Sequence, residues 1–237
     1  MRWRRWKQSR KTCFSISIPS PTTRERGNAM TRLILVRHGE TEWNRVERFR
    51  GRMDIELNER GRLQAQAVAS RLSTWRIEAI YSSPLKRALQ TAQPLAKACR
   101  RETSHLEGMT DIDYGAWAGH SPEEVAAQHS DLYQTWLEAP HLVQFPEGEG
   151  LEQVRSRAGM AVEQVCTVHA EETVVLVSHM VVNRALICAV LGLDNSSFWK
   201  IGQDNAAISI VDAQGDEYRL VLLNDTCHLV ALSETDL

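Results

Sequence analysis

The chain has 237 residues, 43% of them hydrophobic, which is enough for one large domain or two small ones with a buried core. No run of 18 apolar residues occurs, so the sequence predicts no transmembrane helix and no membrane partner. Residues 1–29 carry a formal charge of +7 and the remaining 208 residues a formal −9, an acidic body that argues against nucleic acid as a partner.

The basic segment at residues 1–29 is too polar to bury much surface. We therefore expect a disordered leader or a spurious upstream extension there, and a single domain over residues 30–237 that begins at Met30. The five cysteines are scattered and form no C-x-x-C pair, which favours a reducing cytoplasm over a disulfide framework. No Cys/His spacing resembles a zinc site.

Strand-like and helix-like segments alternate along the chain. Asn58 is a suitable N-cap for a helix that continues to about Leu72, with Leu63, Ala67 and Leu72 roughly on one predicted face. Ser83-Pro84 has the composition of another helix beginning. The predicted elements, in chain order, are a strand at 33–36, a helix at 58–72, a strand at 78–82, helices at 83–98, from 121 and at 151–169, a strand from 173, a helix at 182–192, and strands at 207–211 and 218–223.

This alternation predicts an α/β fold, a three-layer α/β/α sandwich around a mixed, mainly parallel sheet. Residues 119–150 interrupt the alternation, and we expect them to form a small cap insertion over the site. The aromatic and imidazole side chains in and beside this segment either point into the site or pack against the domain; they are Trp117, Tyr133, Trp136 and His141.

Two of the predicted strands end at a histidine. Arg37, His38 and Gly39 follow the first strand, and His179 follows the strand that starts at Thr173. Ligands of open α/β sheets bind at the carboxyl ends of the strands, where these two histidines can meet. A cation, an imidazole and a glycine at such an edge indicate an anion site that contains a nucleophile.

Five segments occur in an order that resembles the histidine phosphatase superfamily, in its phosphoglycerate-mutase-like branch. The resemblance extends from about Thr31 to about Leu223 and implies the α/β/α fold. Its motifs are L-V-R-H-G-E-T-x-x-N at 35–44, G-x-x-D-x-x-L-N-x-x-G at 51–61, S-S-P-L-K-R-A at 82–88, D-x-x-x-G-x-W-x-G at 111–119, and V-S-H with a later arginine at 177–184.

The resemblance implies a role for the residues that follow the two strands and for Arg87. His38 would accept the phosphoryl group as a phosphohistidine, which splits one displacement into two steps. Arg37 and Arg87 would hold the phosphoryl oxygens, because guanidinium groups offer paired donors that match phosphate. His179 would stabilise the charge on the transferring group. The resemblance implies no metal and no other cofactor.

The proton donor to the leaving group departs from the family pattern. Asp111 stands four residues before Gly115, where the family usually carries a glutamate. Asp111 is the predicted general acid, and Glu107 and Asp113 remain competitors.

The pocket around the phosphoryl group is predicted from the same motifs. Gly39, Glu40 and Asn44 follow the first histidine and would shape the binding site. Met180 follows the second histidine, where relatives commonly have glycine, and would narrow or cover the pocket.

The leading prediction is a phosphomonoesterase that hydrolyses a small phosphorylated metabolite. One alternative is a cofactor-dependent phosphoglycerate mutase, although such mutases resemble longer chains. Another is a catalytically weakened module that binds a phosphorylated ligand, which Asp111 and Met180 motivate. Sugar phosphates, phosphoglycerates, α-ribazole phosphate and phosphoproteins all fit the predicted chemistry, and a homodimer is left open.

Overall fold

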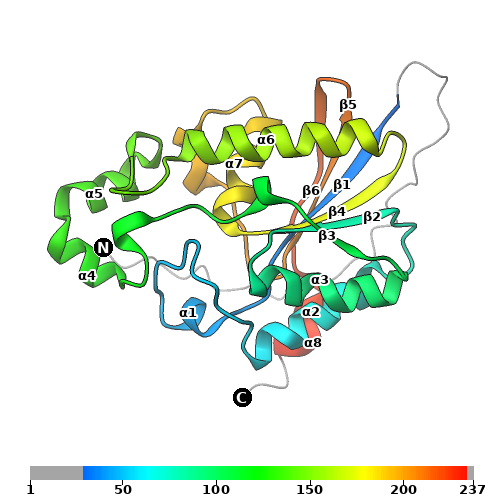
Figure 1. The fold of residues 1–237 in the computed structure, drawn as a ribbon, viewed down its shortest axis with the longest axis horizontal. Helices are drawn as coiled ribbons and strands as arrows, with labels where there is room; N and C mark the ends of the chain where they lie inside the picture. Colours follow the sequence, from blue (N-terminus) through cyan, green and yellow to red (C-terminus); the bar gives the residue numbers. More distant parts are fainter. Residues whose placement is uncertain (1–28, 234–237) are drawn as a thin grey trace.

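A six-stranded mixed sheet forms the centre of this computed structural model, which describes residues 29–233 (Figure 1). Its strands are β1 (Thr31–Arg37), β2 (Ala79–Ser82), β3 (Thr103–His105), β4 (Thr173–Ser178), β5 (Ile208–Gln214) and β6 (Glu217–Asp225). They lie in the order β3-β2-β4-β1-β5-β6. The first three pairings are parallel, and β5 is antiparallel to both of its neighbours.

Helices cover both faces of the sheet, so the predicted three-layer sandwich is confirmed (Figure 1). On one face lie α2 (Glu59–Leu72) and α3 (Lys86–Cys99); on the other lie α6 (Leu151–Val168) and α7 (Met180–Val190). The remaining helices are α1 (Glu42–Arg45), α4 (Pro122–Gln128), α5 (Ser130–Glu138) and α8 (Val230–Ser233), with short 3-10 helices η1 (Glu107–Met109), η2 (Gly115–Trp117), η3 (Pro140–Leu142), η4 (Asn195–Lys200) and η5 (Cys227–Leu229).

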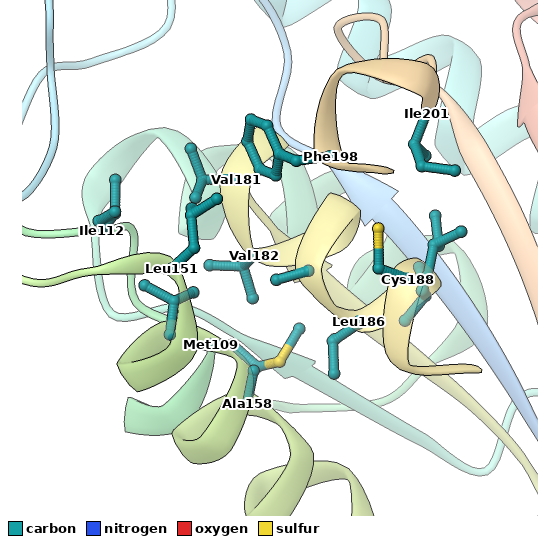
Figure 2. Close-up of a cluster of buried hydrophobic side chains, with 14 of the residues drawn as sticks. Met109, Ile112, Leu151, Ala158, Val181, Val182, Leu186, Cys188, Phe198 and Ile201 are labelled. Atoms are coloured by element: carbon teal, nitrogen blue, oxygen red, sulfur yellow. The ribbon is translucent and has the colours of Figure 1, made fainter. Parts of the chain in front are cut away.

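Two apolar cores form because successive side chains of a strand point to opposite faces. In β1, Ile34 and Val36 pack in the core beneath α2 and α3. Leu33 and Leu35 belong to the larger core beneath α6 and α7, part of which Figure 2 shows. Burial of β1 on both faces explains why this strand is a continuous apolar run.

Two details of the predicted helices were wrong. The buried face of α2 consists of Gln64, Val68 and Leu72 with their small neighbours, whereas Leu63 is 38% exposed. This stripe keeps the spacing of three and four residues that faces the sheet and α3, and Leu63 lies outside it. The helix predicted to begin at Ser83 begins at Lys86, and the Ser83 hydroxyl turns towards His179 instead.

Other boundaries shifted for local reasons. The helix predicted from residue 182 begins at Met180, directly after His179. Strand β3 was not predicted, because Thr103–His105 is three residues long and has no apolar side chain.

Residues 1–28, which contain almost all of the predicted leader, lie outside the described residues. None of the helices within residues 29–233 combines the length and the apolar character of a membrane-spanning segment.

The segment 119–150 contains α4, α5 and η3 and closes with a bridge between Gln144 and Gly150. Trp136 of this segment and Trp117 just before it are almost fully buried among core aromatic rings, with Phe145 about 5 Å from each. Both tryptophans therefore pack against the domain. His141 is exposed.

A close backbone approach fixes the loop after β1. A Cβ atom added to Gly61 would lie 2.0 Å from the carbonyl oxygen of Glu40, and one added to Gly39 would lie 2.5 Å from that of Gly61. Both contacts are with backbone atoms, which cannot turn away as a flexible side chain can. The two glycines therefore let the first turn of α2 support the loop that carries His38.

Gly61→Ala should lower the free energy of unfolding by about 1–3 kcal/mol, the usual effect of overpacking a rigid site. Gly159→Ala is the matched control: this glycine lies within α6 with no atom within 4 Å of the added Cβ, so the change should stabilise by about 0.5–1 kcal/mol. Urea unfolding measures both. A Gly61→Ala protein as stable as the wild type would show that the loop yields easily.

Candidate active site

The two strand-end histidines lie side by side at the carboxyl edge of the sheet. Strands β1 and β4 pair in parallel, and Arg37 lies opposite Ser178, so the next residues along both strands are His38 and His179. Their ring centroids are 5.2 Å apart, and neither side chain is more than 1% exposed. Strand register alone therefore brings together two residues that are 141 positions apart.

The hydrogen bonds of His38 fix which of its nitrogens can react. Its Nδ1 lies 2.7 Å from the carbonyl oxygen of Gly39, which can only accept, so Nδ1 carries the proton. The lone pair is then on Nε2. Burial, reinforced by the charges of Arg87 and Arg37, holds the pKa of His38 well below its ordinary value. The imidazole is thus neutral and keeps a free lone pair.

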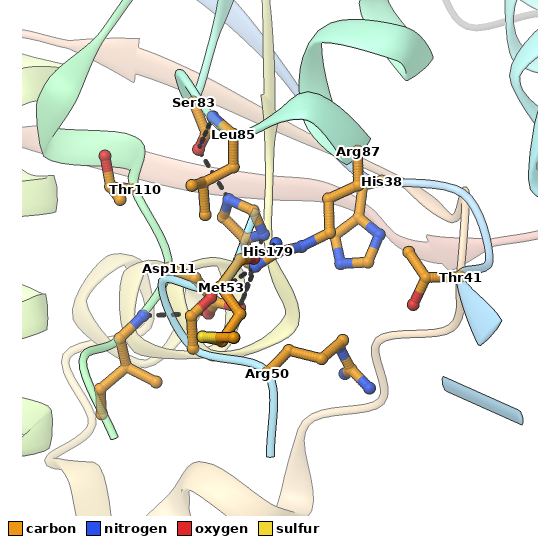
Figure 3. Close-up of polar contacts among 12 residues, drawn as sticks. His38, Thr41, Arg50, Met53, Ser83, Leu85, Arg87, Thr110, Asp111 and His179 are labelled. Carbon is orange, nitrogen blue, oxygen red and sulfur yellow. Dashed lines mark hydrogen bonds and ion pairs between the residues drawn. The ribbon is translucent and has the colours of Figure 1, made fainter. Parts of the chain in front are cut away.

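Arg87 lies in the first turn of α3 and is completely buried. Its guanidinium donates to the carbonyl oxygens of Met53 at 2.8 Å and Gly51 at 2.7 Å, and to the Asp111 carboxylate at 2.9 Å (Figure 3). These bonds hold the planar group in one orientation beside the histidines.

Arg37 ends β1 and donates to the carbonyl oxygen of Gln203 at 2.5 Å. Burial and the like charges of Arg50 and Arg184 lower the pKa of Arg37 to about 9. Arg50 was not predicted as a site residue, although it directly precedes Gly51, the first residue of the motif at 51–61. Its side chain lies with those of His38 and Asp111 in Figure 3, and its charge lowers the pKa of both histidines.

Among the three candidate acids, the structure places Asp111 beside the histidines. Its Oδ2 accepts from Arg87 and lies 3.6 Å from Nδ1 of His179, while Oδ1 accepts from the backbone N–H of Ile112 at 3.0 Å. Glu107 is exposed. Asp113 accepts from the N–H of Gly115 and lies 3.6 Å from an exposed arginine, Arg52.

Asn44 and Glu40, two of the predicted pocket residues, support the loop after His38. The side-chain oxygen of Asn44 accepts from the N–H of Thr41, the N-cap of α1, and from the amide of Asn205 at 3.3 Å. The Glu40 carboxylate accepts from the side chain of Asn58 at 2.8 Å. Both residues therefore hold the backbone around the site.

Gly39 and Met180 directly follow the two histidines. Gly39 donates its N–H to the hydroxyl of Thr91 at 3.0 Å, and its lack of a side chain allows the contact with Gly61. Met180 begins α7 and is partly buried against the larger core. The N-terminus of α7, which is the positive end of the helix dipole, thus lies next to His179.

Ser83 is a second residue that sequence reasoning missed. It is fully buried, and its hydroxyl lies 2.7 Å from Nε2 of His179. The pattern Ser-Pro before a helix favoured a capping role, and nothing in the linear sequence shows that Ser83 and His179 meet.

The charges of the site favour an anion. Four arginines, Arg37, Arg50, Arg87 and Arg184, lie near two carboxylates, Asp111 and Asp204, and burial keeps both histidines neutral. The surplus of two positive charges matches a phosphate monoester dianion. In the part of the chain that the structure describes, no group of three His, Cys, Asp or Glu side chains is arranged to hold a metal ion.

Comparison with known proteins identifies relatives over most of the chain. Residues 33–226 match the model of the histidine phosphatase superfamily (branch 1). Phosphoserine phosphatase 1 of Hydrogenobacter thermophilus is 44% identical over 200 residues, which cover 84% of this chain and 95% of the relative. The metal-independent phosphoserine phosphatase of Arabidopsis thaliana is 33% identical over 203 residues, 84% of each chain.

Solved structures of similar fold also include a phosphoserine phosphatase. YhfR of Bacillus stearothermophilus superposes with a TM-score of 0.81 at 30% identity, covering 84% of this chain and 99% of the other. A mutant phosphoserine phosphatase of Entamoeba histolytica, solved in complex with phosphoserine, gives 0.77 at 32% identity and covers 84% and 100%.

The buried neutral histidines predict how stability depends on pH. Because the folded state lowers the pKa of His38 and His179, the unfolded chain binds more protons below pH 6.5. Stability should therefore fall progressively as the pH drops through 6.5, because the unfolded histidines take up protons that the folded ones do not.

Urea unfolding at several pH values measures this dependence. His38→Gln, which removes one of these titrating groups, should flatten the acid side of the profile. A His38→Gln profile parallel to that of the wild type would mean that His38 is not held neutral by the fold.

Proposed function

The chain belongs to the histidine phosphatase superfamily, and we propose that it hydrolyses O-phosphoserine, or a closely similar phosphorylated acid, through a phosphohistidine on His38. It is a phosphomonoesterase of a small phosphorylated metabolite, as its phosphoserine phosphatase relatives support. The observation that carries the proposed mechanism is the free lone pair on Nε2 of a neutral His38, beside buried arginines with surplus positive charge.

The reaction follows from this arrangement in two displacements. Nε2 of His38 attacks phosphorus, the bond from phosphorus to the ester oxygen breaks, and that oxygen leaves with a proton as the alcohol. Water then attacks the phosphohistidine, inorganic phosphate leaves, and the electron pair returns to Nε2. Arg37 and Arg87 hold the phosphoryl oxygens in both steps, so the protein supplies mainly positioning and charge stabilisation.

Asp111 is the proposed proton donor to the leaving alcohol. Oδ2 faces both Arg87 and His179, and Oδ1 faces only one backbone N–H. A protonated Asp111 can donate from Oδ2, the oxygen that lies beside Arg87 and His179. In the second displacement the same carboxylate can accept a proton from the attacking water.

A carboxylate in the substrate is the finer part of the proposal. Phosphoserine appears in the names of several relatives, and an Entamoeba histolytica relative has been solved with 3-phosphoglyceric acid. Arg50 and Arg184 both repel Arg37, so these cations lie close together. Arg184 stacks on Phe198 and Trp199, about 5 Å from each ring centroid. Such a cluster suits a second negative group besides the phosphate.

The two alternatives from the sequence are less well supported. A mutase reading fits relatives such as the probable phosphoglycerate mutase GpmB of Proteus mirabilis at 31% identity, but the 44% identical relative is named a phosphatase. A weakened binding module is disfavoured because Asp111 lies beside the histidines and Met180 packs against the core. Cys99, Cys166 and Cys188 form no disulfide, which supports a reducing cytoplasm.

A substrate panel without added metal tests the proposal. O-Phosphoserine and 3-phosphoglycerate should be hydrolysed with a kcat/KM at least about tenfold above that of O-phosphoethanolamine, which lacks the carboxylate. Arg50→Gln should reduce this preference, whereas Arg48→Gln should keep it, because Arg48 bonds to Gly119 outside the site. Equal rates on all three esters would remove the carboxylate from the proposal, and activity that depends on a metal would contradict the mechanism.

Asp111→Asn separates proton donation from positioning. The variant should lose about 10²–10⁴-fold in kcat with phosphoserine, whose alkoxide needs a proton. The loss should be far smaller with p-nitrophenyl phosphate, whose leaving group is stable as an anion. Equal losses on both substrates would assign Asp111 to positioning Arg87, and no loss on either would return Glu107 and Asp113 to consideration.

A further inference from the structure

The hydroxyl of Ser83 reaches the second histidine through the register of the sheet. Ser82 lies opposite Val177 in the parallel pairing of β2 with β4, and the N–H of Ser83 extends it with a bond to the carbonyl oxygen of Val177 at 2.9 Å. Ser83 is therefore next to the end of β4, where its Oγ lies 2.7 Å from Nε2 of His179. Both side chains are completely buried, so water does not compete for this bond.

The other partners of the Ser83 hydroxyl decide the direction of this hydrogen bond. Its oxygen accepts from the backbone N–H of Leu85 at 3.4 Å, and the described residues offer its proton no acceptor besides His179. If the hydroxyl donates to Nε2, both its oxygen and its proton have a partner. If Nε2 donated instead, the hydroxyl proton would be buried without a partner, which costs about 1–3 kcal/mol.

The opposite side of the imidazole leads to the same assignment. Nδ1 of His179 is buried without a hydrogen bond, and the nearest charged atom is Oδ2 of Asp111 at 3.6 Å. A proton on Nδ1 points towards that carboxylate, which is favourable. A lone pair on Nδ1 would face the carboxylate oxygen instead and would repel it. Burial and Arg87 lower the pKa of His179, so the ring carries a single proton.

We infer that Ser83 is a positioning residue that fixes His179 as the Nδ1–H tautomer, with its one N–H directed towards Asp111. Which imidazole nitrogen holds the proton is set by the hydrogen bond that the other nitrogen makes. From that position Nδ1–H donates to an oxygen of the phosphoryl group as negative charge develops on it. With the opposite tautomer, His179 would present a lone pair to the same oxygen and would repel it.

The catalytic consequence rests on the proposed function, but the tautomer does not. Nitrogen NMR of protein with ¹⁵N-labelled histidine distinguishes a protonated ring nitrogen from an unprotonated one, and the His179→Gln spectrum assigns the signals. In the wild type without ligand, His179 should be protonated at Nδ1 and unprotonated at Nε2. A wild-type ring protonated at Nε2 overturns the inference, whatever the substrate proves to be.

Variants connect the tautomer to turnover. Ser83→Ala should populate the other tautomer and reduce kcat with phosphoserine about 10²-fold, the usual loss for one misdirected donor, while KM changes little. Ser83→Thr, which keeps a hydroxyl, should restore both signals. Ser82→Ala is the matched control, because this equally buried hydroxyl donates to the carbonyl oxygen of Ser83 and does not reach His179.

The outcomes distinguish the role of Ser83 in setting the His179 tautomer from the identity of the substrate. A Ser83→Ala protein with an unchanged tautomer and an unchanged kcat overturns the role of Ser83. If phosphoserine is not a substrate, the same comparison is made with p-nitrophenyl phosphate, whose hydrolysis also needs a stabilised phosphoryl group. Loss of the proposed substrate would then leave the tautomer result intact.

Discussion

The site depends on keeping two imidazole rings neutral in a buried environment that is rich in positive charge. Burial removes water that would stabilise a charged imidazole, and the nearby arginines disfavour a further cation. The same arginines have too few carboxylates to balance them, so an anion is the partner that relieves their repulsion. The same arrangement of charge therefore keeps the nucleophile neutral and forms the anion site.

The pair formed by Arg87 and Asp111 connects binding to proton transfer. Asp111 offsets the charge of Arg87 and lies 3.6 Å from Nδ1 of His179. A phosphoryl group that binds Arg87 competes for the guanidinium and weakens its hold on Asp111. Substrate binding itself would thus free the carboxyl group to exchange a proton, as a general acid requires.

The site residues at strand ends could be predicted from the sequence. An apolar run predicts a strand, and the histidine that follows it marks the end of that strand at the sheet edge. His38 and His179 could be placed together from that pattern, as could the α/β/α layers. Ser83 and Arg50 could not, since their roles depend on which strands are neighbours and on how a loop folds back. The buried face of α2 was misassigned because small residues and Gln64 fill it, and a search for large apolar side chains selected the exposed Leu63.

The most direct test is to identify the residue that carries the phosphoryl group during turnover. Protein mixed with phosphoserine, denatured rapidly in base and analysed by mass spectrometry should carry a base-stable, acid-labile phosphoryl group on His38. The His38→Ala protein should show neither the modification nor turnover. A phosphoryl group on another residue, or hydrolysis that persists in His38→Ala, would contradict the account.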